Sequence, residues 1–209
     1  MRYKINFPCS TKKGFTLLEI TVVVAIITLL STIFLANYRA GERAFALQRS
    51  VHKLSQDLRR VEEMAISARK FEDTFPKGGY GIYFTINPTF GECENASNGY
   101  CIFLFADCDG NNQYDSSGPA FSCAVATPED PYNPYPEKIE EISLETGIKI
   151  LRFEPMGNVL TITFFPPDPE VTFNADPSSS IDHVSIILTI DGGQEKKVSI
   201  YKTGLIDID

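Results

Sequence analysis

The chain has 209 residues, of which 43% are hydrophobic and 22% are charged, enough for one modest globular core. Residues 1–14 contain four cations and no Asp or Glu, so removing these cations from the net charge of −8 leaves −12 for the remainder. A body this acidic repels phosphate backbones at long range, which argues against nucleic acid as a partner.

The segment after this basic leader is apolar. Residues 15–36 read FTLLEITVVVAIITLLSTIFLA and carry a single charge, Glu19. A helix of this length rises about 33 Å, enough to cross the hydrocarbon core of a bilayer. Lys12 and Lys13 directly precede the segment, so the positive-inside rule predicts a cytoplasmic N-terminus and an extracytoplasmic body. We therefore expect a single-pass protein of the cytoplasmic membrane.

A cleaved secretory signal peptide and an ordinary signal anchor are the alternatives for this segment. The apolar run is longer than the usual core of a signal peptide, carries an acid near its start, and has no A-x-A-like cleavage site around Ala36. A signal anchor accounts for the apolar run but not for Glu19 and its neighbours.

Those neighbours, KKGFTLLE from Lys12 to Glu19, resemble the prepilin cleavage motif of type IV pilins and type II secretion pseudopilins. The resemblance implies that prepilin peptidase cuts between Gly14 and Phe15 and that Phe15 is then N-methylated. Glycine suits this position because a residue without Cβ lets the backbone enter a tight protease site. The resemblance also implies an assembly role for Glu19. An ionised carboxylate in an apolar segment is costly, and the α-amino group of Phe15 on a neighbouring subunit would pair with it.

An amphipathic pattern follows the apolar segment. Apolar residues from Leu47 to Ala68 recur at alternating spacings of four and three, which marks one helical face, and the pattern fails at the turn 75–79. The helix is therefore expected to continue through residues 37–70 and to pack against a head formed by residues 71–209. Major pilins usually carry a helix-kinking proline near the position of Ala36, and its absence favours a minor subunit.

Past Gly79 the hydrophobic period changes to two, which predicts strands over 80–86, 100–105, 139–144, 148–153, 159–165, 184–190, 197–201 and 205–208. Hairpin turns are expected at Thr146-Gly147, Met156-Gly157-Asn158 and Asp191-Gly192-Gly193, and proline-rich surface loops at 127–136 and 166–180. The expected fold class is α+β, with a long N-terminal helix packed on an antiparallel, β-rich head.

Three short segments of the sequence resemble H-class minor pseudopilins and related type IV minor pilins: residues 58–66, 151–157 and 198–205. The resemblance implies a subunit that helps to prime or join a pilus or pseudopilus. Its partners would be other pilin or pseudopilin subunits, prepilin peptidase and an inner-membrane assembly platform. Residues 92–136 depart from the pattern and are interpreted as an insertion.

The insertion contains all the cysteines except Cys9 of the leader: Cys93, Cys101, Cys108 and Cys123. An even set in an exported body predicts disulfides. Four cysteines allow three pairings, and we favour Cys93–Cys101 with Cys108–Cys123 because close partners need the least loop closure. A zinc site is the alternative, although no C-x-x-C spacing occurs.

The insertion also carries a candidate calcium loop, with oxygen side chains at Asp107, Asp109, Asn111 and Asp115. Calcium requires several such hard oxygen ligands around one ion. The EF-hand template fails, because Gly110 stands at the fourth loop position and Gly118 replaces the closing Glu. A last ligand would come from Glu129, Asp130 or backbone carbonyls. The alternative is a solvated turn rich in Asp, Asn and Gly.

No catalytic pattern emerges from the sequence. His52 and His183 are the two histidines, and neither a nucleophile elbow nor a Walker loop occurs. We expect a structural minor pilin or pseudopilin and not an enzyme. The alternatives are a DNA-uptake or adhesive tip pilin and a signal-anchored ectodomain of another activity. Secretion pseudopili, type IV pili and competence pili share the same N-terminal chemistry.

Overall fold

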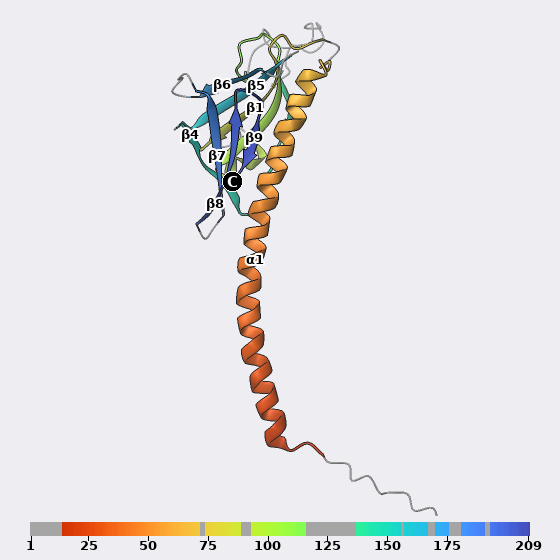
Figure 1. Cartoon of the computed structure of the whole chain (residues 1–209), viewed down its shortest axis with the longest axis vertical. Coiled ribbons are helices and arrows are strands. Elements are labelled where there is room, and N and C mark those ends of the chain that lie inside the picture. The colour runs from red at the N-terminus through yellow and green to blue at the C-terminus, as the bar shows by residue number, and fades with distance from the viewer. Residues whose placement is uncertain are drawn as a thin grey trace, which may run out of the picture. The chain divides into compact units, whose positions relative to one another are not determined.

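The computed structural model describes residues 14–71, 74–88, 93–115, 137–155, 157–166, 170–175, 181–190 and 193–209. The chain divides into two units, Met1–Glu42 and Arg43–Asp209. Helix α1 (Leu17–Ile66) begins in the first unit, and the second unit contains its remaining turns and the strands β1 to β9 (Figure 1).

In the first unit, α1 begins after a capping residue. Thr16 Oγ1 accepts the backbone N–H of Glu19 at 3.2 Å, which satisfies one of the free donors of the first turn. The span Leu17–Leu35 is long and apolar enough to cross a membrane. Along it, three hydroxyls donate to carbonyls three residues earlier, so these polar groups are satisfied within the helix: Thr21, Thr28 and Thr32.

In the second unit, α1 buries an apolar face at residues that are at most 2% exposed: Leu47, Val51, Leu54, Leu58 and Val61. Burying each such side chain contributes about 1.5–3 kcal/mol. The helix ends at Ile66, earlier than the expected Lys70, because Ala68 adopts a left-handed φ of 43°. The Arg69 N–H then turns back to the Met64 carbonyl at 3.2 Å, the bond of a Schellman cap, with alanine where glycine is usual.

The larger sheet is antiparallel, with the order β3-β2-β1-β5-β6. Its strands are β1 (Gly79–Ile86), β2 (Tyr100–Asp107), β3 (Lys138–Glu141), β5 (Val159–Phe165) and β6 (Glu170–Ala175). The central strand β1 aligns Ile82 with Leu104 of β2 and Ile162 of β5, and all three side chains are fully buried in the core. Because side chains alternate along a strand, the intervening residues form a second, outer face.

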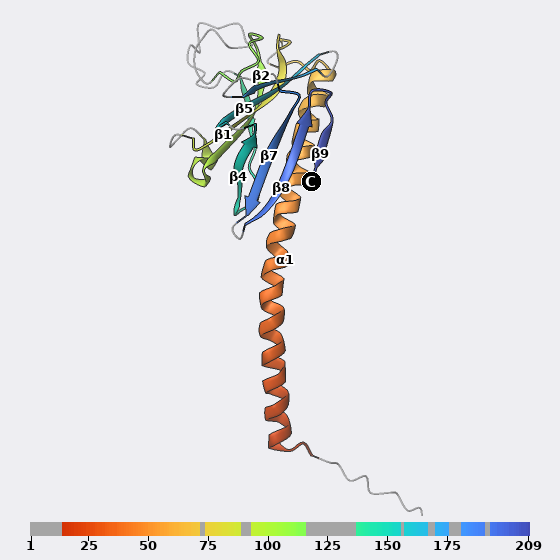
Figure 2. The same ribbon diagram turned by 60° about the vertical axis from the view of Figure 1, so that its left-hand side comes forward.

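The smaller sheet has the order β4-β7-β8-β9 and is also antiparallel. Its strands are β4 (Ile148–Glu154), β7 (His183–Ile190), β8 (Gln194–Tyr201) and β9 (Ile206–Ile208). Their inner side chains join those of the larger sheet and of α1 in one hydrophobic core. Figure 2 shows β7 and β8 as neighbouring long strands. The predicted α+β class with an antiparallel head is confirmed.

Ion pairs connect α1 to β3 and to the chain that follows it. Arg49 pairs with Glu145 through two hydrogen bonds of 2.7 and 2.8 Å, and Arg60 lies 2.9 Å from Glu140. All four side chains are partly exposed, so each pair adds at most about 1 kcal/mol. Their contribution is mainly to orient the helix on the head.

Three expectations for the head were wrong. Strand β6 lies inside the expected surface loop 166–180, because its alternating residues pair with β5 despite the flanking prolines. Thr146-Gly147 and Met156-Gly157-Asn158 do not form hairpins, since β4 belongs to a different sheet from both β3 and β5. The expected hairpin between β7 and β8 is confirmed. The expected loop 127–136 lies outside the described residues.

Candidate functional site

The expected cleavage site lies immediately before α1. Gly14, Phe15 and Thr16 precede the first helical residue, and Phe15 is 78% exposed. A Cβ placed on Gly14 would meet no atom within 4 Å, so the fold itself does not require glycine there. The Gly14–Phe15 bond is outside the helix and accessible to a protease.

Glu19 occupies the third position of the helix and is exposed. Thr16 and Glu19 have the spacing of a capping box, which marks the start of a helix. This sequence signal was missed because Glu19 was interpreted only through assembly. A carboxylate in the first turn also interacts favourably with the helix dipole. Among the described residues, no Lys or Arg forms an ion pair with Glu19.

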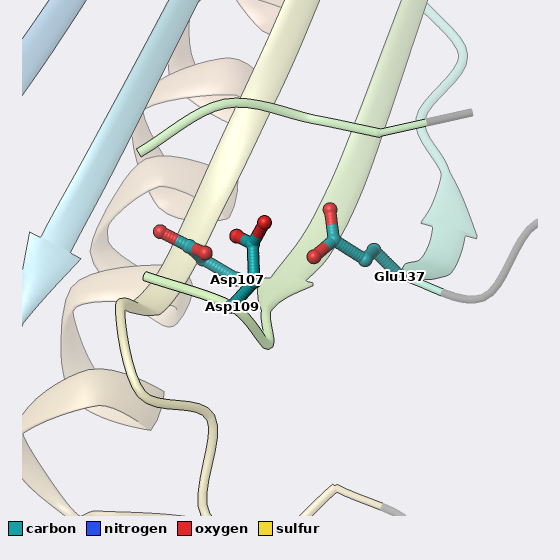
Figure 3. A group of neighbouring side chains, drawn as sticks. All are labelled: Asp107, Asp109 and Glu137. Carbon is teal, nitrogen blue, oxygen red and sulfur yellow. The ribbon is translucent and has the colours of Figure 1, made fainter. Parts of the chain in front are cut away.

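Three carboxylates gather where β2 ends and β3 begins (Figure 3). Asp107 is the last residue of β2, Asp109 lies in the following loop, and Glu137 directly precedes β3. One carboxylate oxygen from each lies within 4.8 Å of the others. Asp107 and Glu137 are fully buried, whereas Asp109 is partly exposed. Oxygen ligands at such separations are the kind that calcium prefers.

Asp107 binds the middle of the loop through two backbone hydrogen bonds. Its Oδ1 accepts the N–H of Gly110 and its Oδ2 accepts the N–H of Asn112, both at 2.8 Å. Gly78 packs against this carboxylate, and a Cβ at Gly78 would overlap it. Burial raises the pKa of Asp107, while the two N–H donors oppose the rise.

Glu137 holds the two ends of the loop together. Its Oε1 accepts the N–H of Cys108 at 3.1 Å, and its Oε2 accepts the N–H of Asp115 at 3.0 Å. Burial raises the pKa of Glu137 from 4.5 to about 7, the two N–H donors oppose the rise, and the charges of Asp107 and Asp115 add to it. No described Lys or Arg forms an ion pair with either buried carboxylate.

The loop residues expected to hold calcium are connected to one another. Asn111 Nδ2 donates to Asp109 Oδ2 at 3.0 Å and to Asp115 Oδ2 at 2.7 Å. Asp107 and Asp109 belong to the carboxylate group, whereas Asp115 is joined to Glu137 only through its backbone. Glu137 was missed because it lies 22 residues beyond Asp115, outside any loop template. Glu129 and Asp130 lie outside the described residues.

Tyr114 fixes the loop to the outer face of the larger sheet. Its ring centroid lies 5.0 Å from that of Tyr83, 5.3 Å from Phe103 and 5.6 Å from Phe105. Tilted and edge-on aromatic contacts of this kind stabilise by about 0.5–1.5 kcal/mol each. The loop is therefore packed against strands β1 and β2 and not simply solvated.

The expected Cys93–Cys101 disulfide is confirmed. Cys93, just before the short 3-10 helix η1 (Glu94–Asn98), is bonded to Cys101 of β2. This bond fixes η1 to the larger sheet. The pairing Cys108–Cys123 stays a prediction because Cys123 lies outside the described residues.

Comparison with known proteins concerns the N-terminal region. Residues 9–35 match the prokaryotic N-terminal methylation motif. The match contains Gly14, Phe15 and Glu19 and nearly all of the apolar segment, and it leaves the head unassigned. No curated protein and no solved structure matches the chain. The matched motif is of the type IV prepilin-like kind, and it overlaps a helix that is long and apolar enough to cross a membrane.

Proposed function

We propose that the chain is the precursor of a minor pilin or pseudopilin, cleaved between Gly14 and Phe15, N-methylated at Phe15, and assembled through α1. The observation that carries this proposal is the methylation motif at residues 9–35, continuous with a helix able to span a membrane. Type IV pilin-like proteins are structural subunits, so we propose no catalytic activity. Its processing partner would be prepilin peptidase.

Glu19 would act in assembly. A carboxylate within an apolar membrane segment costs a few kcal/mol unless it is paired. Cleavage before Phe15 creates a positively charged amino group one helical turn away, and in a bundle of subunits this group would lie near Glu19 of a neighbour. Pairing between subunits would then favour assembled helices over isolated ones. The cap from Thr16 keeps the first turn helical around Glu19.

The head would lie outside the cytoplasm. Lys12 and Lys13 precede the membrane segment, and the Cys93–Cys101 disulfide suits an oxidising compartment. The H-class resemblance and the absent proline near Ala36 favour a minor, initiating or tip-proximal subunit over the bulk of a fibre.

Assembly is tested with Glu19→Gln, which keeps the size of the side chain and removes its charge. The cells used must contain the chain's own assembly machinery, and sheared fibres are separated from membranes. We expect the variant to be cleaved normally but depleted at least tenfold from the fibre fraction. Glu42→Gln, an exposed position further along α1, is the matched control. Equal incorporation of Glu19→Gln and the unaltered chain would contradict the assembly role.

Calcium binding is a second proposal, supported by the position of Glu137. Asp107, Asp109, Asn111 and Asp115 were expected to need one more ligand. Glu137, which directly precedes β3, faces Asp107 and Asp109 (Figure 3). Two buried carboxylates this close repel each other, and a divalent cation would offset that repulsion. Its role would be structural, to hold the loop on the sheet.

The test is the melting temperature of the purified protein with millimolar calcium or with a chelator. Calcium should raise the melting temperature, and Asp109→Ala should abolish the increase. Asp182→Ala, at an exposed aspartate before β7, is the control and should leave it unchanged. An unaltered chain whose melting temperature does not respond to calcium would refute this proposal.

A further inference from the structure

Among the described residues, the outermost strand of the larger sheet, β6, has a neighbouring strand on one side, β5. It pairs with β5 over Leu160↔Ala175 to Phe165↔Glu170 and continues the sheet no further among the described residues. Its Val171 is buried in the core, and the Val171 N–H reaches the Lys202 carbonyl at 3.4 Å. An edge strand held in this way opens more easily than a central one.

The loop after β2 crosses the outer face of the sheet as far as β6. At its far point, Asn112 Oδ1 accepts the hydroxyls of Thr163 on β5 and Thr172 on β6, at 3.2 and 3.3 Å. These threonines are register partners, and their hydroxyls also contact each other. Asn112 has a left-handed φ of 61°, which turns its side chain onto this pair, and asparagine tolerates that conformation better than most residues.

The loop is also fixed near the opposite edge of the sheet, where β2 ends and β3 begins. The Asn112 N–H is held by Asp107 at the end of β2, and the Asp115 N–H is held by Glu137 before β3. Between them, the Tyr114 ring packs on β1 and β2. The segment Asp107–Asp115 therefore contacts both edges of the five-stranded sheet and the strands between them.

We propose that Asp107–Asp115 is a strap that holds the edge strand β6 in the sheet, so that loss of its Asn112 contacts releases β6 before the rest of the head opens. Asp107 then controls an edge three strands away, because it holds the backbone of Asn112. Release of β6 would uncover the backbone donors and acceptors of β5. The proposal depends neither on pilus assembly nor on calcium.

Hydrogen exchange of the full-length protein in detergent tests the strap. Asn112→Gly keeps the left-handed backbone accessible and removes only the side chain. We expect amides of β6 to exchange roughly fivefold faster, since Asn112 makes one hydrogen bond to β6, through Thr172, and each net hydrogen bond lost corresponds to about a fivefold change. Amides of β7 and β8 report opening of the whole head and should change much less. Asn87→Gly, at another asparagine with a positive φ of 58°, is the matched control and should leave β6 unaffected.

Two further variants distinguish a specific effect of the strap on β6 from a general loss of stability of the head. Thr172→Val removes the hydroxyl on β6 and keeps the shape of the side chain, and Asp107→Asn weakens the hold on the Asn112 backbone. Both should speed exchange in β6 in preference to β7. Unchanged exchange in β6 for Asn112→Gly and Thr172→Val would overturn the proposal. An equal increase in β6, β7 and β8 would also overturn it, because the contacts would then support only global stability.

Discussion

Replacing Glu137 with glutamine should remove a pH dependence from the stability of the head. The carboxylate is fully buried between the N–H groups of Cys108 and Asp115, and burial raises its pKa from 4.5 to about 7. Glutamine keeps the length of the side chain and one acceptor oxygen but cannot ionise. It therefore resembles the protonated form of Glu137 at every pH.

The magnitude follows from the two pKa values. As pH rises above 4.5, Glu137 ionises in the unfolded chain but stays protonated in the fold until about pH 7. Its contribution to the free energy of unfolding is therefore greatest below pH 4.5 and is lost as pH rises to about 7. At about 1.4 kcal/mol per pKa unit, the loss amounts to about 3 kcal/mol.

The assay is urea unfolding of the full-length protein in detergent with a chelator present, at about pH 5 and about pH 8, on either side of the titration. Between these conditions the unaltered chain should lose about 2.5 kcal/mol more than Glu137→Gln does, less than the full amount because a pH of about 5 already lies above 4.5. Glu63→Gln, at an exposed glutamate on α1, is the control and should follow the unaltered chain. If the unaltered chain and Glu137→Gln lose the same stability, Glu137 is not the titrating group.

Three further predictions concern the rest of the head. Cys93→Ser combined with Cys101→Ser should lower the free energy of unfolding by about 2–3 kcal/mol in urea, because the bond closes a short loop; an unchanged midpoint would contradict this. Leu58→Ala should cost about 2–5 kcal/mol in thermal unfolding, since Leu58 is fully buried in the core that α1 and the two sheets share, and a loss under about 1 kcal/mol would argue against that packing. Gly78→Ala should lower the melting temperature because its Cβ would overlap the Asp107 carboxylate, and a variant as stable as the unaltered chain would show that the loop moves aside.

Much of the fold could be predicted from periodicity. The apolar face from Leu47 to Val61 and the run Val159–Phe165 both carry a hydrophobic period that matches their structure. Strand β6 was missed because prolines flank it, and local composition outweighed its short alternation. The wrong hairpins show a related limit, since turn residues such as Thr146-Gly147 report a change of direction but not which sheet receives the next strand.

The candidate sites also differ in whether the sequence alone could predict them. The cleavage motif and Glu19 are contiguous in the sequence, so a local pattern suffices to find them. The carboxylate group is not contiguous, because Glu137 reaches Asp107 only after β2 and β3 have paired. The contact of Asn112 with Thr163 and Thr172 likewise depends on the sheet register and has no sequence signal.

The most direct test of the proposed function is the intact mass of the protein extracted from membranes of cells that contain prepilin peptidase. We predict a chain that begins at Phe15 and carries one added methyl group on its α-amino nitrogen. In cells without the peptidase, the same measurement should give a chain that retains residues 1–14. A chain that retains the leader in the presence of an active prepilin peptidase would contradict the account.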